Sequence, residues 1–174
     1  MKKTTNLWGL IGFAITSFGG TILHFLYDWT QKSIFVSPFS GVNESTWEHM
    51  KLLFWPMLAF SIFESFFMKE RSDFWCIKLR GITLGLVLIP VLFYTYNGVV
   101  GKSPDWINIV IFFISAACVY IFESKLLNQE KTRCKSPKLA IIILVVIGIL
   151  FVVFTYFTPE INIFKDPIYG TYGI

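Results

Sequence analysis

The chain has 174 residues, of which 55% are hydrophobic and only 15% are Asp, Glu, Lys or Arg. Soluble domains usually carry about 25% charged residues, so this chain has too little charge to cover a surface that faces water. The composition also excludes the disordered, collagen-like and coiled-coil classes. An aromatic share of 18% is typical of a membrane core with aromatic anchors at its interfaces.

Five apolar stretches follow one another along the chain, at residues 7–25, 47–68, 74–96, 106–122 and 139–157. Each is close to the roughly 17–25 residues that a helix needs to cross a bilayer. Strand alternation is absent, and a helix satisfies its own backbone in lipid. The sequence therefore predicts an all-α, polytopic integral membrane protein with five transmembrane helices in a single domain, residues 1–174. The remaining segments are predicted to be an outer loop at 29–46, a cytoplasmic loop at 125–138 and an outer tail at 158–174.

The first stretch follows Lys2 and Lys3, as the core of a signal peptide would. Its apolar run is too long for such a core and no small-residue cleavage site ends it, so we expect a retained helix. Its small and polar residues recur at four-residue spacing: Gly12, Thr16, Gly20, His24 and Asp28. Neighbours in such a series share a helix face, and small residues let another helix approach closely. We expect this face to present His24 and Asp28 at the outer end.

Basic residues are divided unevenly between the two ends of this arrangement. Eleven of the 15 fall at the end that holds the N-terminus and the loops after the second and fourth stretches: Lys2, Lys3, Lys69, Arg71, Lys78, Arg80, Lys125, Lys131, Arg133, Lys135 and Lys138. The opposite end has Lys32, Lys51, Lys102 and Lys165. Cytoplasmic loops are enriched in Lys and Arg, so the N-terminus is predicted in the cytoplasm and the C-terminus outside the cell membrane. Contact with anionic lipid explains the basic rim, and no nucleic-acid partner is expected.

Both histidines fall at the outer end or at its interface, together with most of the remaining polar candidates. The candidate ligand-binding residues are His24, Asp28, Asn43, Glu44, Glu48, His49, Tyr94 and Asp105. If a helix already begins near Val42, Glu44 and Glu48 stack on one side of it at i, i+4. Imidazoles and carboxylates together suit a divalent cation or acid–base chemistry. The metal alternative uses His24, Asp28, Glu44 and His49.

A structural interpretation of the same segment is stronger. Ser45 and Glu48 form a capping box, in which both side chains satisfy free backbone N–H groups at a helix start. Asn43 could serve as the cap instead. Carboxylates in a first helical turn also complement the helix dipole. Capping explains Glu48 well and Glu44 less well, and it leaves His24 and His49 without a role.

Three further features of the sequence lead to structural predictions. The tail from Phe164 to Ile174 is too aromatic for an ordinary solvated terminus, so we expect it to fold back over the outer helix ends as a lid or a plug. Glu64, Arg80 and Glu123 lie near the inner ends of their stretches, where snorkelling or a Glu64–Arg80 pair would satisfy them. Because none of the three cysteines falls in the oxidising compartment, a structural disulfide is not expected.

Several strings carry a resemblance to a known group of sequences: GTILHFLYDW, NESTWEHMKLLFWPM, LIPVLFYTYNGVVGKSPDWINI and FKDPIYGTYGI. The chain resembles an uncharacterised family, a domain of unknown function, of small multi-spanning bacterial membrane proteins. NESTWEH and KDPIYGTYGI are the most specific of these strings, and the resemblance extends over nearly the whole chain. It implies a bacterial cytoplasmic-membrane protein and assigns no catalytic or binding residues.

These observations favour a non-enzymatic membrane protein that binds a small solute or ion from outside, as a transporter component. No nucleotide-binding element is present, so energy coupling would need a partner membrane subunit or a gradient. A first alternative is a metal-dependent membrane hydrolase acting at the outer leaflet with a divalent metal ion. A second is a non-catalytic accessory or immunity protein whose outer loops contact a partner.

Overall fold

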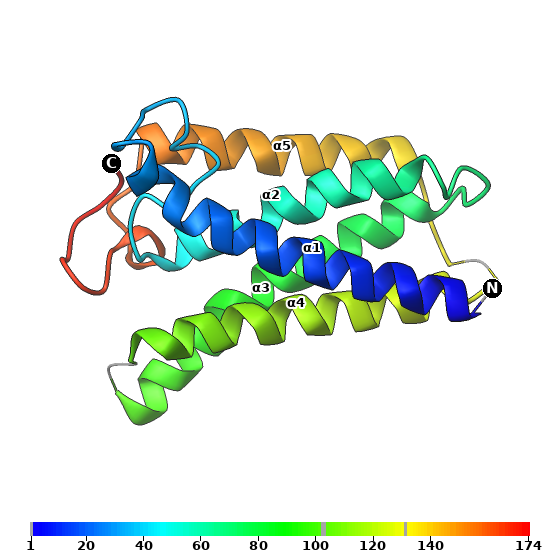
Figure 1. Ribbon diagram of the computed structural model, residues 1–174, viewed down its shortest axis with the longest axis horizontal. Coiled ribbons are helices and arrows are strands. Elements are labelled where there is room, and N and C mark those ends of the chain that lie inside the picture. The colour runs from blue at the N-terminus through cyan, green and yellow to red at the C-terminus, as the bar shows by residue number, and fades with distance from the viewer. Residues whose placement is uncertain (1, 102–103, 131) are drawn as a thin grey trace.

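The computed structural model describes residues 2–101, 104–130 and 132–174, and it is a bundle of five α-helices (Figure 1). The helices are α1 (Lys2–Trp29), α2 (Thr46–Ser65), α3 (Phe74–Val100), α4 (Asp105–Leu127) and α5 (Pro137–Tyr156). A single 3-10 turn, η1 (Asn162–Phe164), follows them. Within the described ranges there is no β-strand, and the one isolated bridge joins Lys165 to Tyr172. The all-α prediction is confirmed.

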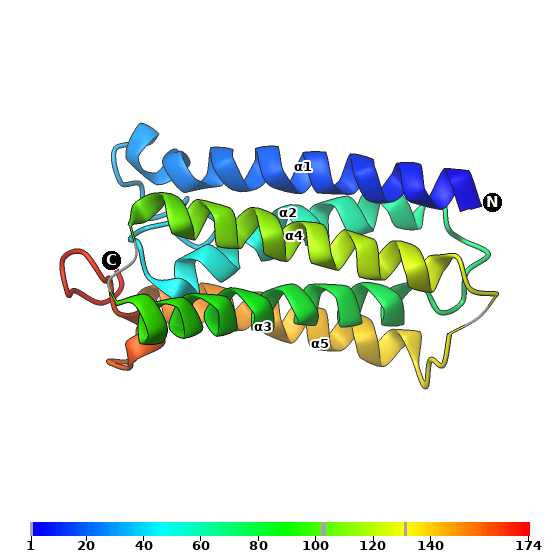
Figure 2. The ribbon, with the colours of Figure 1, turned by 90° about the horizontal axis from the view of Figure 1, so that it is seen from below.

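Both ribbon views agree on which connections share an end of the bundle (Figures 1 and 2). The start of α1 lies at the same end as the turn between α2 and α3 and the connection between α4 and α5. The loop between α1 and α2 lies at the opposite end, with the C-terminal tail. We call these the basic end and the tail end.

Four helices are long and apolar enough to cross a membrane: α1 from Thr5 onward, α3, α4 from Trp106 onward, and α5. By helix length and composition, this finding supports a membrane protein. The α2 helix carries Glu48, Lys51 and Glu64, and all three side chains are buried inside the bundle.

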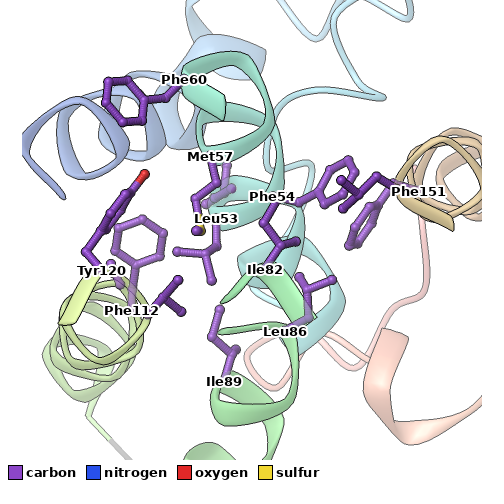
Figure 3. Close-up of a cluster of buried hydrophobic side chains, with 14 residues drawn as sticks. Leu53, Phe54, Met57, Phe60, Ile82, Leu86, Ile89, Phe112, Tyr120 and Phe151 are labelled. Carbon is purple, nitrogen blue, oxygen red and sulfur yellow. The ribbon is translucent and has the colours of Figure 1, made fainter. Parts of the chain in front are cut away.

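The hydrophobic core is centred on α2 (Figure 3). Leu53, Phe54 and Met57 project from α2 toward Ile82 of α3 and Phe151 of α5, and all five side chains are buried. Phe112 and Tyr120 of α4 close the core on another side, as Figure 3 shows. Lipid tails are as apolar as these side chains, so in a bilayer it is close van der Waals packing that holds α2 against its neighbours.

The observed helices differ from the predicted ranges mainly at their ends. The first and third helices are longer than 7–25 and 74–96, because polar residues such as Asn97 continue the helix beyond the apolar run. The second ends at Ser65 rather than at 68, where the chain turns toward α3. The fourth continues to Leu127 rather than stopping at 122, because Glu123 is buried in the bundle and does not mark an interface. The fifth starts at Pro137.

The small-residue face of α1 packs against its neighbours as expected. A Cβ atom added at Gly12 would lie 2.3 Å from the Tyr120 ring, and one at Gly20 would lie 2.5 Å from the Phe112 ring. Between them the Thr16 hydroxyl is hydrogen-bonded to the Tyr120 hydroxyl at 2.6 Å. Glycine is therefore required at both positions for α1 to approach α4 this closely.

The basic end is joined by side-chain contacts between the α2–α3 turn and the segment before α5. Arg71 pairs with Asp73 at 2.9 Å, and Asp73 accepts hydrogen bonds from the backbone N–H and the hydroxyl of Thr132 at 2.7 and 2.9 Å. Burial of the Asp73 carboxyl opposes its ionisation, but the Thr132 and Arg71 hydrogen bonds outweigh burial and hold its pKa below the ordinary value.

A disulfide between Cys76 and Cys134 lies at the same end, so the expectation of no structural disulfide is wrong for this structure. The two cysteines are 58 residues apart in sequence and form no motif that pairs them. The loop bound to Asp73 brings Cys134 back to the start of α3, with the two Cα atoms 5.8 Å apart. Cys118 is a free, exposed thiol.

Candidate ligand cavity at the tail end

The loop between α1 and α2 folds back over the helix ends through backbone and side-chain hydrogen bonds. Ser40 Oγ accepts a hydrogen bond from the Tyr27 N–H at 2.9 Å and donates to the Leu23 carbonyl. Nearby, the Trp55 indole N–H donates to the Pro38 carbonyl at 3.0 Å. These contacts satisfy carbonyl and amide groups at the end of α1, and they bring the segment that precedes α2 next to His24.

The start of α2 is fixed by a serine cap. Ser45 is the N-cap residue, and its hydroxyl accepts a hydrogen bond from the Glu48 N–H. In the predicted capping box, the Glu48 carboxylate would accept a hydrogen bond from the Ser45 N–H. It accepts instead from the Val42 N–H at 3.0 Å. Asn43 accepts from the Ser45 N–H and donates to the Gly173 carbonyl. Asn43 is therefore a structural link to the tail.

Glu44 and Glu48 do not stack on one helix face, so that expectation is wrong. The helix begins at Thr46, which leaves Glu44 in the preceding turn. The Glu44 carboxylate turns toward the two histidines, whereas Glu48 turns inward to Lys51. The physical reason is that Ser45 is the N-cap residue, so the helix begins after it and Glu44 stays outside the helix.

Glu44 lies between the two imidazoles. Its carboxylate oxygens are 3.6 Å from His24 Nε2 and 3.6 Å from His49 Nε2. The His49 ring is oriented by its other nitrogen, since Nδ1 lies 3.0 Å from the Ser45 carbonyl, which can only accept. In the neutral ring Nδ1 therefore carries the proton, and Nε2 is an acceptor that faces another acceptor, the Glu44 carboxylate.

These groups line a cavity of about 330 Å³ between α1, the start of α2 and α4. Its lining residues are Gly20, Thr21, His24, Phe25, Glu44, His49, Leu52, Asn108, Ile109, Phe112, Phe113 and Ile168. The Asn108 Oδ1 atom is buried and has no hydrogen-bond partner in the described part of the chain. The cavity thus combines apolar walls with one polar corner, where Glu44, His49 and Asn108 all offer acceptors.

The C-terminal tail covers this end of the bundle, as the sequence predicted. Phe164 is buried, with its ring centroid 4.6 Å from that of Trp47. The Asp166 carboxylate is also buried and accepts hydrogen bonds from the N–H groups of Glu44, Ile168 and Tyr169. Ile168 therefore reaches the cavity wall on a turn that Asp166 fixes.

A buried ion pair lies in the first turns of α2. Lys51 Nζ lies 2.6 Å from the Glu48 carboxylate and also donates to the Ser37 carbonyl at 2.8 Å and to the Thr155 hydroxyl at 3.0 Å. Both charged side chains are almost fully excluded from solvent. Glu48 is therefore a structural partner of Lys51, and Lys51 joins α2 to α5 and to the loop after α1.

Two other candidates are not brought to the cavity. Asp28 of α1 and Tyr94 of α3 are both exposed, and neither side chain lines the cavity. The side chain of Asp105 lies outside the described part of the structure. Among the described residues, no three His, Cys, Asp or Glu side chains are arranged to hold a metal ion. The divalent-metal alternative therefore has no support from the geometry.

A second polar cluster lies deeper, near the basic end. Lys78 Nζ is 2.5 Å from the Glu64 carboxylate and 2.6 Å from the Glu123 carboxylate, and all three side chains are buried. The predicted Glu64–Arg80 pair is wrong, because the Arg80 guanidinium reaches outward to the Arg133 carbonyl instead. Lys78 lies two residues before Arg80 on α3, so the two side chains point in different directions.

The sequence predicted Glu44 and His49 of the polar corner but not Asn108 or the apolar walls. Asn108, Leu52 and Phe112 lie in apolar helical runs, where nothing in the local pattern separates them from ordinary core residues. The four-residue series on α1 gave the only signal, since Gly20 and His24 both line the cavity.

The comparisons with known proteins give one match. A family model described as Family of unknown function (DUF6512) matches residues 1–174. No curated protein and no solved structure matches the chain.

Proposed function

The chain belongs to DUF6512 over its whole length, and we propose that it is a multi-pass bacterial cell-membrane protein whose tail-end cavity binds a small amphiphile. The head group of that amphiphile is a protonated amine, held at Glu44, and its apolar part lies against the aromatic wall. Binding occurs from the outer side, and the protein serves as the solute-binding component of a transporter with a partner membrane subunit.

Three hydrogen-bond acceptors at the polar corner carry this proposal. The Glu44 carboxylate, the unpartnered Asn108 Oδ1 and the neutral His49 Nε2 all accept hydrogen bonds. An alkylammonium group offers three donors and a positive charge, and so complements all three acceptors. A carboxylate head group would instead face Glu44 with like charge and without a donor.

The apolar walls account for the rest of the ligand. Phe25, Ile109 and Phe113 line the cavity and are 45%, 56% and 37% exposed, so its opening lies on the bundle surface between α1 and α4. In a membrane this surface faces lipid near the interface. An amphiphile can therefore enter from the outer leaflet with its head group toward Glu44.

Five membrane spans follow if α2 crosses together with the four apolar helices. Its 20 residues extend about 30 Å, the thickness of the hydrocarbon core. The charges on α2 do not oppose this arrangement, because Glu48 pairs with Lys51 and Glu64 pairs with Lys78 inside the bundle. The excess of Lys and Arg at the basic end supports a cytoplasmic N-terminus and an outer C-terminus.

This orientation puts the Cys76–Cys134 pair at the cytoplasmic end, where reducing systems keep most thiols free. We therefore expect both cysteines to be thiols in growing cells and to form the disulfide on oxidation. Acid-quenched cells treated with a membrane-permeant, mass-tagged maleimide should show labelling of both residues without prior reduction, as for Cys118. Labelling of Cys76 and Cys134 only after reduction would instead place the basic end outside.

Native mass spectrometry of the protein extracted from its own membranes tests the binding proposal. The wild type should retain a small ligand that Glu44→Gln loses, because the amide removes the charge that pairs with the amine. Glu160→Gln is a matched control, since Glu160 is an exposed carboxylate in the tail. A ligand-free wild type, or equal retention by Glu44→Gln, would count against the proposal.

A further inference from the structure

We propose that Glu64, Lys78 and Glu123 form a proton-binding site inside the bundle, which holds one exchangeable proton at neutral pH. The site is separate from the tail-end cavity and does not depend on what that cavity binds. Its three members come from three helices, α2, α3 and α4, and each is about 1% exposed.

The charges of the cluster do not balance. One ammonium group, Lys78 Nζ, contacts two carboxylates at 2.5 and 2.6 Å, so full ionisation would leave a net negative charge in the bundle interior. An uncompensated buried ion costs several kcal/mol even after relaxation. One proton bound to the pair of carboxyl groups removes this charge, and such a pair titrates as a unit.

Among the described residues, no second cation contacts the two carboxylates. Lys78 of α3 and Glu64 of α2 interact electrostatically with Glu123. The Tyr120 phenol of α4 interacts electrostatically with both carboxylates. Between Thr5 and Tyr27, α1 has no Asp, Glu, Lys or Arg, and α5 has none after Lys138.

The two nearby arginines are also engaged away from the cluster. Arg71 pairs with Asp73, and Arg80 bonds the Arg133 carbonyl. Neither guanidinium group is therefore available to neutralise the second carboxylate.

Glu123 Oε1 is placed to carry the proton. It is buried and has no hydrogen-bond partner among the described residues, whereas Glu123 Oε2 and Glu64 Oε2 both contact Lys78 Nζ. Lys78 Nζ also lies 5.4–5.8 Å from the ring centroids of Phe60, Phe74 and Tyr120. These rings stabilise the ammonium form, so the ionisable proton belongs to the carboxyl pair.

A route for exchange begins at a cavity of about 580 Å³ between α1 and α4 toward the basic end. Tyr120, Ser124 and Asn128 line it, and Ser124 directly follows Glu123. Because the Tyr120 ring borders both this cavity and Lys78, the cluster is one side chain away from the cavity. The structure thus points to proton exchange with the basic end.

Infrared spectroscopy of the purified protein at neutral pH tests the assignment, since a protonated carboxyl gives a C=O band that a carboxylate does not. The wild type should show one such band, which shifts in D₂O and disappears at alkaline pH. Glu123→Gln and Glu64→Gln should each abolish it, because one carboxylate then balances Lys78. Lys78→Met should double it, because both carboxyls must then be neutral.

Glu70→Gln is the matched control, since Glu70 is exposed in the turn after α2, and it should leave the band unchanged. Elution as a single species and an unfolding temperature near that of the wild type show that each variant is folded, and the two Glu→Gln variants test the assignment independently. No band in the wild type, a band insensitive to D₂O, or a band that survives both Glu→Gln changes would overturn the proposal.

Discussion

Replacing Lys51 with Met should lower the free energy of unfolding by about 3–5 kcal/mol, the cost of removing one partner from a buried ion pair. The loss follows from what remains behind, because the buried Glu48 carboxyl would have no cation and would have to take up a proton, with only the Val42 N–H bonded to it. The Ser37 carbonyl and the Thr155 hydroxyl would also lose their donor. Reversible unfolding in detergent measures the change.

A second variant separates the charge effect from lost packing. Combining Lys51→Met with Glu48→Gln removes both charges and keeps an acceptor for Val42, so most of the lost stability should return. Lys69→Met, at an exposed position, should change the free energy of unfolding by less than about 0.5 kcal/mol. A Lys51→Met protein as stable as the wild type would show that the pair contributes nothing.

Gly81→Ala should destabilise the protein by at least about 1–3 kcal/mol, the usual range for overpacking a core. A Cβ atom at this position of α3 would lie 2.1 Å from Glu123 Oε1, so the carboxyl group must move and its contact with Lys78 is disturbed. The neighbouring helix is fixed by the buried cluster and cannot yield easily.

The same helix offers a control of opposite sign. A Cβ atom at Gly98 meets no atom within 4 Å, so Gly98→Ala should stabilise α3 by about 0.5–1 kcal/mol through helix propensity. Both free energies of unfolding are measured in one detergent against the wild type. If the two substitutions change stability in the same direction, the close approach of Gly81 to Glu123 is not what the structure describes.

The fold could be predicted because helices long and apolar enough to cross a membrane are visible as apolar runs in the sequence. Apolar runs marked all five helices, and the four-residue series on α1 marked the face that packs against Tyr120 and Phe112. The distribution of Lys and Arg separated the two ends of the bundle. Helix ends were less predictable, because a polar residue near the end of a run, such as Glu123, can be buried instead of exposed.

Local sequence patterns could not predict which residues far apart in the sequence would pair. Lys51 was placed with the outer basic residues, yet it is buried against Glu48 and Thr155. Lys78 and Arg80 have the same charge and are two residues apart, so only the rotation of α3 decides which one meets Glu64. The Cys76–Cys134 pair depends in the same way on a loop that folds back onto α3.

Binding of a protonated amine at Glu44 in the tail-end cavity is tested most directly by three ligands of six carbon atoms each. Hexylamine, 1-hexanol and hexanoate are similar in size and differ in the head group, and a ligand that binds the folded state raises the unfolding temperature. Hexylamine should raise the unfolding temperature of the wild type in a concentration-dependent way. Hexanol should raise it less, and hexanoate least. Glu44→Gln should abolish the hexylamine effect. An equal rise with hexanoate, or a full hexylamine effect in Glu44→Gln, would contradict binding of an amine at Glu44.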